Sequence, residues 1–238
     1  QNLGGGDVAS SRGYAQDSSR IALILGIFYG LVLVVLAKPL VSLLQVNDLT
    51  VFDNTCDYLR IVGVGIPLTY VSAAITGVFN GAGNSRLSFR ANAVGLLVNM
   101  ILDPLMILVW GWDVKGAAIA TVIAQGTVCA LFIIFIKRHP NRPFEQFHIL
   151  GPIEPARLRQ IIRWSLPVAV ESGAFTALAM VVTGMVSSWY GETAVAVQRV
   201  GSQIESLSWL IGGGFSSAVT AFAGQNFGAR KWERIRKG

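Results

Sequence analysis

Residues 117–136 read AAIATVIAQGTVCALFIIFI, and none of these twenty residues carries a charge. A helix needs about 20 mostly apolar residues to cross the hydrocarbon core of a bilayer. Lipid offers the backbone no hydrogen-bond partners, so a spanning segment satisfies its own N–H and C=O groups by forming a helix. The stretch therefore predicts one transmembrane helix.

Five further segments have the same character. Hydrophobic residues make up 53% of the chain and charged residues only 13%, whereas soluble domains carry roughly a quarter charged residues. We predict an all-α integral membrane protein with six transmembrane helices. Lys38 and Pro39 mark the expected outer end of the first span, with a short interfacial turn after them. Besides 117–136, the predicted spans are 21–44, 61–79, 91–109, 164–189 and 195–222.

Basic residues fall in every second loop. Of the 19 Lys and Arg residues, 15 lie before residue 21, within 80–90, within 137–163 or after residue 222. Short cytoplasmic loops carry an excess of Lys and Arg, so both ends are predicted on the cytoplasmic side of the cell (inner) membrane. Because the net charge of +6 is spread over loops, it does not indicate nucleic-acid binding. The opposite loops hold the acids Asp48, Asp53, Asp57, Asp113 and Glu192.

One carboxylate inside a predicted span has a polar neighbour on the same helix face. Asp103 follows Asn99 by four residues and directly precedes Pro104. Charged groups inside the membrane are costly and are functional candidates by default. The spacing puts carboxylate and carboxamide on one face, and Pro104 frees a backbone carbonyl near Met100. The pattern predicts a proton or cation site, with a structural hydrogen-bonded pair as the alternative.

Three other charges lie within the predicted spans. Glu171 follows Pro167 by four residues, and either a second protonatable site or a structural hydrogen bond fits it. For Glu205 we favour a structural role, and Arg199 lies near the outer end of its helix, where it can reach the interface. Cys56 and Cys129 lie apart and both histidines lie in a loop, so neither a resident metal nor a nucleophilic triad is predicted.

A linker and a repeat divide the chain into two parts. Residues 137–163 hold four prolines and then a basic amphipathic stretch, 156–164, which predicts a helix on the membrane surface. The sequence Gln-Asn-Leu-Gly-Gly at 1–5 recurs as Gln-Asn-Phe-Gly-Ala at 225–229. Repeats of this spacing indicate two homologous helical bundles, as in secondary transporters. Because the chain begins with Gln1, we expect it to be part of a longer protein.

Four motifs together resemble the multidrug and toxic compound extrusion (MATE) family across essentially the whole chain. Two are the repeated segments just described, which resemble the ends of the second helix in each lobe of the family. The third is Phe-Asn-Gly-Ala-Gly-Asn-Ser at 79–85, which resembles the loop after the fourth helix. The fourth is Asn-Met-Ile-Leu-Asp-Pro at 99–104 followed by Gly-Ala-Ala-Ile-Ala-Thr at 116–121.

The resemblance implies a twelve-helix, two-lobe antiporter that exports organic cations or drugs in exchange for H⁺ or Na⁺. Residues 1–136 would be the last four helices of the N-lobe, 137–157 the inter-lobe cytoplasmic linker and 158–238 the first two helices of the C-lobe. Asn99, Asp103 and Thr121 would match the N-lobe cation site, with Na⁺ as one candidate at Asn99 and Asp103. Glu171 falls about one turn from an acid on the seventh helix of some members. No cofactor besides the coupling ion is implied, and a monomer surrounded by membrane lipid is expected.

Three alternatives stay open. A lipid-linked oligosaccharide flippase of the same superfamily would usually line its cavity with more cationic residues than Arg199 alone. An intramembrane enzyme is disfavoured because the spans contain no His and no paired nucleophile. A non-transporting scaffold would not require Asn99 and Asp103 on one face. The sequence does not define the substrate, the coupling ion or the oligomeric state.

Overall fold

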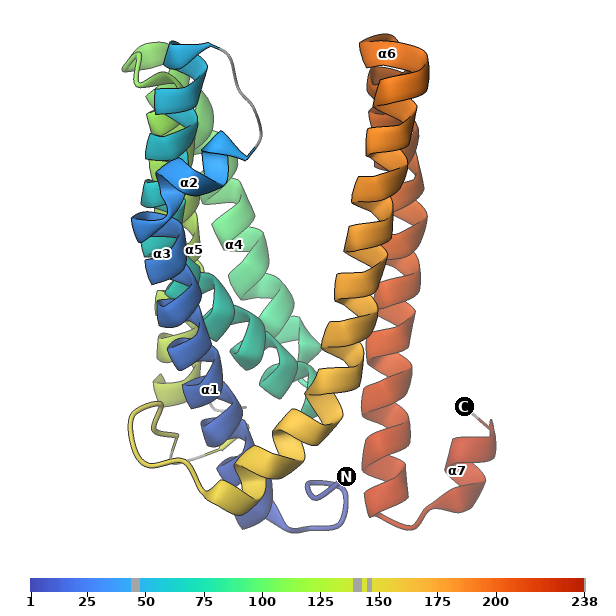
Figure 1. Cartoon of the computed structure of the whole chain (residues 1–238). Helices are drawn as coiled ribbons and strands as arrows, with labels where there is room; N and C mark the ends of the chain where they lie inside the picture. The colour runs from blue at the N-terminus through green and yellow to red at the C-terminus, as the bar shows by residue number, and fades with distance from the viewer. Residues whose placement is uncertain (44–47, 139–142, 145–146, 238) are drawn as a thin grey trace.

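The protein is all-α. The computed structural model describes every residue except 44–47, 139–142, 145–146 and 238, and the side chain of Glu192. Parts of the predicted linker, and the last residue of the first predicted span, therefore lie outside the described residues. In chain order (Figure 1) the elements are α1 (Val8–Val35), α2 (Ala37–Ser42), α3 (Leu49–Gly81), α4 (Ser85–Pro104), the π-helix η1 (Leu105–Val109), α5 (Asp113–Arg138), α6 (Pro155–Gly228) and α7 (Trp232–Lys237).

Among the described residues, six helices are long and apolar enough to cross a membrane, which confirms the predicted fold class. α4 and η1 together form the third of them, Ser85–Val109. α6 supplies two, Pro155–Gly191 and Thr193–Gly228. Gly191 separates them with φ 76° and ψ −175°, a backbone conformation that glycine adopts without steric cost. The two halves of α6 consequently run in opposite directions as a hairpin (Figure 1).

The helices extend beyond their apolar stretches. α1 begins at Val8 rather than at residue 21, because Asp7 caps it by accepting a 3.0 Å hydrogen bond from the Ser10 amide. The hydrogen bonds from the Ser10 side chain and backbone also lower the pKa of Asp7. Hydropathy detects the apolar middle of a span but not the polar turns at its ends, where the helix meets water.

The predicted surface helix at 156–164 is wrong as a separate element. These residues form the first turns of α6, whose only non-helical residue is Gly191. Pro155 occupies the first helical position, where its missing N–H costs no hydrogen bond. The basic stretch is therefore the polar end of the fifth span, and Figure 1 shows it bent toward the lower end of α1.

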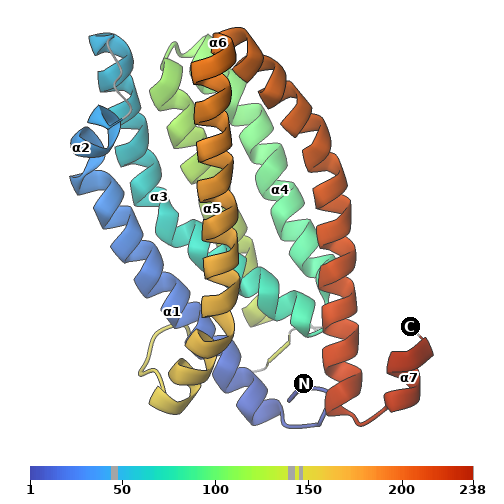
Figure 2. The same cartoon turned by 45° about the vertical axis from the view of Figure 1, so that its right-hand side comes forward.

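The first five helices form one bundle, and the α6 hairpin approaches it at the end that carries both chain termini (Figures 1 and 2). The core of the bundle lies between α3, α4 and α5, where the rings of Phe79 and Phe132 stack with centroids 5.6 Å apart. Of the described side chains in α6, only Asn226 is buried. The core consists of Val71, Ile75, Phe79, Leu87, Ala91, Val128, Cys129, Phe132 and Ile136.

Glycines bring the bundle helices into close contact. A Cβ added to Gly30 would lie 2.4 Å from the carbonyl oxygen of Gly63, so α1 and α3 cross backbone against backbone. A Cβ added to Gly65 would lie 2.6 Å from the Val122 side chain, and one added to Gly95 would lie 2.2 Å from the Val128 side chain. Small residues at such crossings let membrane helices approach closely.

We expect Gly30→Ala to destabilise the full-length protein by about 1–3 kcal/mol, because the added methyl group overpacks the α1–α3 crossing. Thermal unfolding in detergent measures the effect. Gly77→Ala is the matched control, since a Cβ at Gly77 meets nothing within 4 Å among the described residues. Equal melting temperatures for the two variants would contradict the packing argument.

Candidate ion-binding site

Asn99 and Asp103 form a hydrogen-bonded pair on α4. The Asn99 side-chain amide donates to Asp103 Oδ1 at 3.2 Å, and both residues are half-buried. The four-residue spacing places them one turn apart on the same helix face, as predicted. The bond occupies one carboxylate oxygen of Asp103, and among the described residues no hydrogen bond or ion pair reaches the other. The pair presents oxygen atoms suited to a proton or a small hard cation.

The helix changes its hydrogen-bonding pattern directly after this pair. Pro104 has no N–H, so the carbonyl of Met100 receives no helical hydrogen bond from it. The next residues form η1, closed by a bond from the Trp110 amide to the Leu105 carbonyl at 3.0 Å. Single π-turns of this kind occur frequently at functional sites. The Met100 carbonyl, which lies between the two polar side chains in sequence, therefore lacks its usual donor four residues later.

The other two predicted site residues are not joined to this pair. The Thr121 hydroxyl, half-buried on α5, donates to the Ala117 carbonyl at 2.9 Å. Glu171 is exposed on the first half of α6. No hydrogen bond between described residues links Thr121 or Glu171 to Asn99 or Asp103. Glu205 accepts a 3.1 Å bond from the Trp209 indole one turn away, which fits a structural role.

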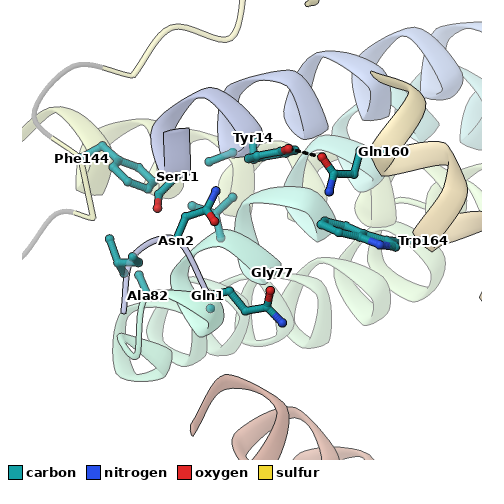
Figure 3. A pocket seen from close by; sticks show the side chains of 13 residues that line it. Gln1, Asn2, Ser11, Tyr14, Gly77, Ala82, Phe144, Gln160 and Trp164 are labelled. Carbon is teal, nitrogen blue, oxygen red and sulfur yellow. Dashed lines mark hydrogen bonds between the residues drawn. The ribbon is translucent and has the colours of Figure 1, made fainter. Parts of the chain in front are cut away.

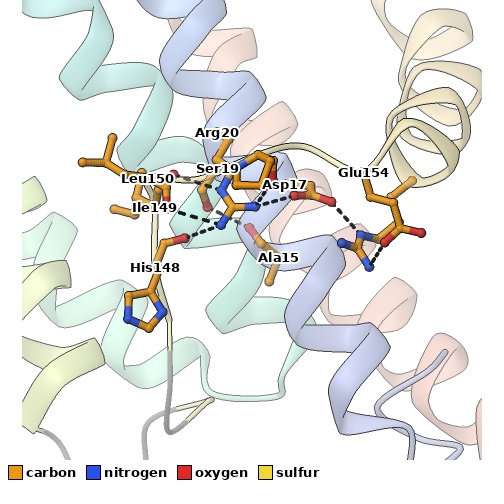
Figure 4. A network of polar contacts seen from close by, with 10 residues as sticks. Ala15, Asp17, Ser19, Arg20, His148, Ile149, Leu150 and Glu154 are labelled. Atoms are coloured by element: carbon orange, nitrogen blue, oxygen red, sulfur yellow. Dashed lines mark hydrogen bonds and ion pairs between the residues drawn. The ribbon is translucent and has the colours of Figure 1, made fainter.

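Sequence reasoning missed a charged cluster near the start of α1 (Figure 4). The Asp17 side chain is completely buried, and its two oxygens contact Arg20 Nη1 at 2.8 Å and Arg157 Nε at 2.6 Å. Arg157 also pairs with Glu154 at 2.6 Å. We call Asp17, Arg20, Arg157 and Glu154 the charge lock. It fastens α1 to the first turn of α6.

The charge lock also fixes the linker. Arg20 donates to the backbone carbonyls of His148, Ile149, Leu150 and Pro152 at 2.6–3.5 Å. These carbonyls precede α6 and have no helical partners, so one guanidinium satisfies several of them. The three-residue spacing of Asp17 and Arg20 could have indicated an ion pair on one helix face. It was not recognised because residues 1–20 were interpreted as a polar loop.

A cavity of ≈ 450 Å³ lies beside the charge lock, between α1, α3 and the start of α6 (Figure 3). The Tyr14 hydroxyl donates to the Gln160 side chain, and the Tyr14 and Trp164 rings stack with centroids 6.3 Å apart. Asn2 and Val78 also contribute to its wall. The cavity is therefore bounded by the N-terminal segment, α1, α3 and the first turns of α6.

Comparison with known proteins agrees with this architecture. A profile of the MatE family matches residues 1–105 and 167–237. The probable multidrug resistance protein YpnP of Bacillus subtilis (strain 168) is 26% identical over 239 residues, which cover 99% of this chain and 52% of that protein. The probable multidrug resistance protein NorM of Thermotoga maritima is 25% identical, covering 98% of this chain and 50% of that protein.

A solved structure has the same fold. A MOP superfamily transporter from Pyrococcus furiosus superposes with a TM-score of 0.89 at 20% identity, covering 99% of this chain and 52% of that one. The chain thus spans about half the length of these relatives. The family profile covers more than half of the chain, and six helices suited to spanning a membrane accompany it. This chain belongs to the MatE family, a family of multi-pass membrane transporters rather than enzymes.

Proposed function

We propose that the full-length protein is a secondary antiporter that exports organic cations or drugs in exchange for H⁺ or Na⁺. The observation that carries the proposal is the Asn99–Asp103 pair, a carboxylate and a carboxamide joined at 3.2 Å within a candidate membrane span. A carboxylate held there is costly unless it binds a cation or a proton. The names of YpnP and NorM support the multidrug substrate class.

In this mechanism Asp103 alternately takes up and releases the coupling ion. Asn99 holds the carboxylate in place through its amide, while Thr121 on the neighbouring α5 supplies a further oxygen once its helix moves. Burial raises the energy of the ionised carboxylate and a bound cation lowers it, so loading changes which helix arrangement is favoured. Transport follows if the loaded and unloaded forms prefer opposite sides of the membrane.

The charge distribution supports a cytoplasmic location for both ends of the chain. The start of α1 and the end of α7 lie on the side that carries the basic loops. Figure 1 shows the two chain ends, N and C, at the same end of the molecule. At the other end, Asp57 pairs with Lys115 at 2.9 Å and with Arg60 at 3.5 Å, which offsets two of the remaining basic residues. This asymmetry follows the positive-inside rule.

The test is dye efflux from proteoliposomes that contain the full-length protein. Ethidium efflux is measured under an imposed proton gradient, an imposed sodium gradient and no gradient. We expect one gradient to accelerate efflux and thereby to identify the coupling ion. An efflux rate that is the same with either gradient as with none would contradict ion coupling. No ethidium movement by correctly inserted protein would favour a flippase, which labelled lipid-linked oligosaccharide would then test.

A further inference from the structure

Another cavity, of ≈ 470 Å³, lies between α1, α3, α5 and linker residues 147–150. Leu23 of α1, Leu68 of α3 and Cys129 of α5 contribute to its wall. None of the described residues of the α6 hairpin lines it, so it belongs to the first bundle and lies apart from the cavity beside the charge lock. Its lining also contains no residue of α4, the helix that carries the candidate ion-binding pair.

The lining of this cavity changes from apolar to basic toward one end. Among the described residues that line it, only Lys137 and His148 have basic side chains, and the others are apolar. Lys137 lies in the last turn of α5. Cys129 precedes it by eight residues, which is about 12 Å along a helix axis. One leaflet contributes roughly half of a hydrocarbon core about 30 Å thick, so the apolar part of the cavity extends through most of the depth of one leaflet.

The linker wall of this cavity is held in place by two kinds of contact. Arg20 donates to the backbone carbonyls of residues 148–150 at 3.2–3.5 Å (Figure 4). The side chains of Phe147 and Ile149 pack against the buried core. On the opposite wall Ile133 is 38% exposed, so the cavity opens to the outer surface of the bundle. A ligand that enters from the surrounding membrane therefore meets a fixed wall and an open mouth.

From this shape and charge we propose that the cavity holds one acyl chain of an anionic phospholipid of the cytoplasmic leaflet, with the lipid phosphate beside Lys137 and His148. The Lys137 ammonium has three N–H donors and the imidazole of His148 has at least one, which suit phosphate oxygens. Basic pockets between membrane helices on the cytoplasmic side bind anionic head groups. A cationic drug would instead meet the like charge of Lys137. The inference goes beyond the proposed transport function and takes from it only the orientation of the chain.

The test counts the lipids bound to the full-length protein by native mass spectrometry. Phosphatidylglycerol and phosphatidylcholine with the same acyl chains are titrated separately in detergent. We expect phosphatidylglycerol to bind more tightly, and Lys137→Gln to lower its affinity about fivefold, the effect of one basic residue near an anionic head group. Lys231→Gln is the matched control, because this exposed lysine does not line the cavity. It should bind phosphatidylglycerol like the parent protein.

A second pair of variants tests the apolar part of the cavity. Ile133→Trp should lower the affinity for phosphatidylglycerol about tenfold, because the indole occupies the space of the acyl chain and removes its dispersion contacts with the wall. Ile134→Trp is the control, since Ile134 is the next residue of α5, is 49% exposed and does not line the cavity. If Ile133→Trp fails to fold, Lys137→Gln decides, because Lys137 is exposed and its replacement disturbs no core packing.

A photoreactive lipid then locates the bound chain. Phosphatidylglycerol with a diazirine in one acyl chain should modify peptides that contain residues 129–137 or 147–150. Modification confined to other segments would overturn the proposal, because another part of the full-length protein would then cover the cavity. Equal affinity of the parent protein for the two lipids, or unchanged affinity in folded Lys137→Gln and Ile133→Trp, would also overturn it. Binding is measured without substrate or gradient, so its outcome is independent of the antiport proposal.

Discussion

Replacing Asp103 with Asn abolishes gradient-driven efflux by the full-length transporter while leaving its insertion intact, if the proposed ion site is correct. The amide keeps the size and the hydrogen-bonding ability of the side chain, but it can neither ionise nor balance a cation. Hydrogen bonds to charged groups are worth about 1.5–3 kcal/mol. For a bound cation that loss corresponds to roughly a 10- to 100-fold drop in affinity, and for a coupling proton the amide offers no site.

The measurement is initial ethidium efflux under the effective gradient, normalised to the amount of inserted protein. Asp53→Asn serves as the control, because this acid is exposed outside the candidate site. It should transport like wild type. Asn99→Ala should weaken transport less than Asp103→Asn, since it removes the positioning amide but keeps the carboxylate. Undiminished gradient-driven efflux by Asp103→Asn would eliminate this residue as the coupling site.

Asp17→Asn is expected to destabilise the full-length protein by about 3–5 kcal/mol, the usual cost of breaking a buried ion pair by removing one partner. The side chain of Asp17 is fully buried and contacts two guanidinium groups. Its loss leaves Arg157 beside a neutral amide. We expect lower yields of folded protein and a lower melting temperature in detergent.

Two further variants separate charge from packing. Arg157→Gln added to Asp17→Asn should recover part of the lost stability, because it removes one of the two guanidinium charges that Asp17 balances. Glu154→Gln should change little, because its side chain is 51% exposed and exposed ion pairs contribute only about 0–1 kcal/mol. A melting temperature of Asp17→Asn equal to that of wild type would show that the charge lock does not stabilise the fold.

The number of spans could be predicted because hydropathy depends only on local composition. Five of the six predicted segments lie wholly within helices long and apolar enough to cross a membrane, whereas the first, 21–44, runs past the end of α1 at Val35. The charge lock could not be predicted in the same way. Asp17 lies in a polar stretch, and its partner Arg157 is 140 residues away. Only tertiary packing brings the two together and excludes water from the carboxylate.

In the candidate site, too, the contact within one helix could be predicted and the contacts between helices could not. Asn99 and Asp103 are four residues apart on one helix, so helical geometry alone predicted their contact. Thr121 and Glu171 belong to other helices, and the direction in which each helix faces depends on packing that the sequence pattern does not contain. Their part in the ion site stays a prediction. So do the lobe boundaries at 1–136, 137–157 and 158–238.

Among the described residues, the α6 hairpin contacts the bundle of α1–α5 at the end that carries the chain termini. This arrangement has a mechanical consequence. The first half of the hairpin comprises 37 residues, and at 1.5 Å per residue its helical path is about 55 Å long. With the charge lock at its base, a tilt of about 10° would carry the far end of a helix of this length by roughly 10 Å. A small movement of Arg157 against Asp17 is thereby amplified toward the opposite end of the helix.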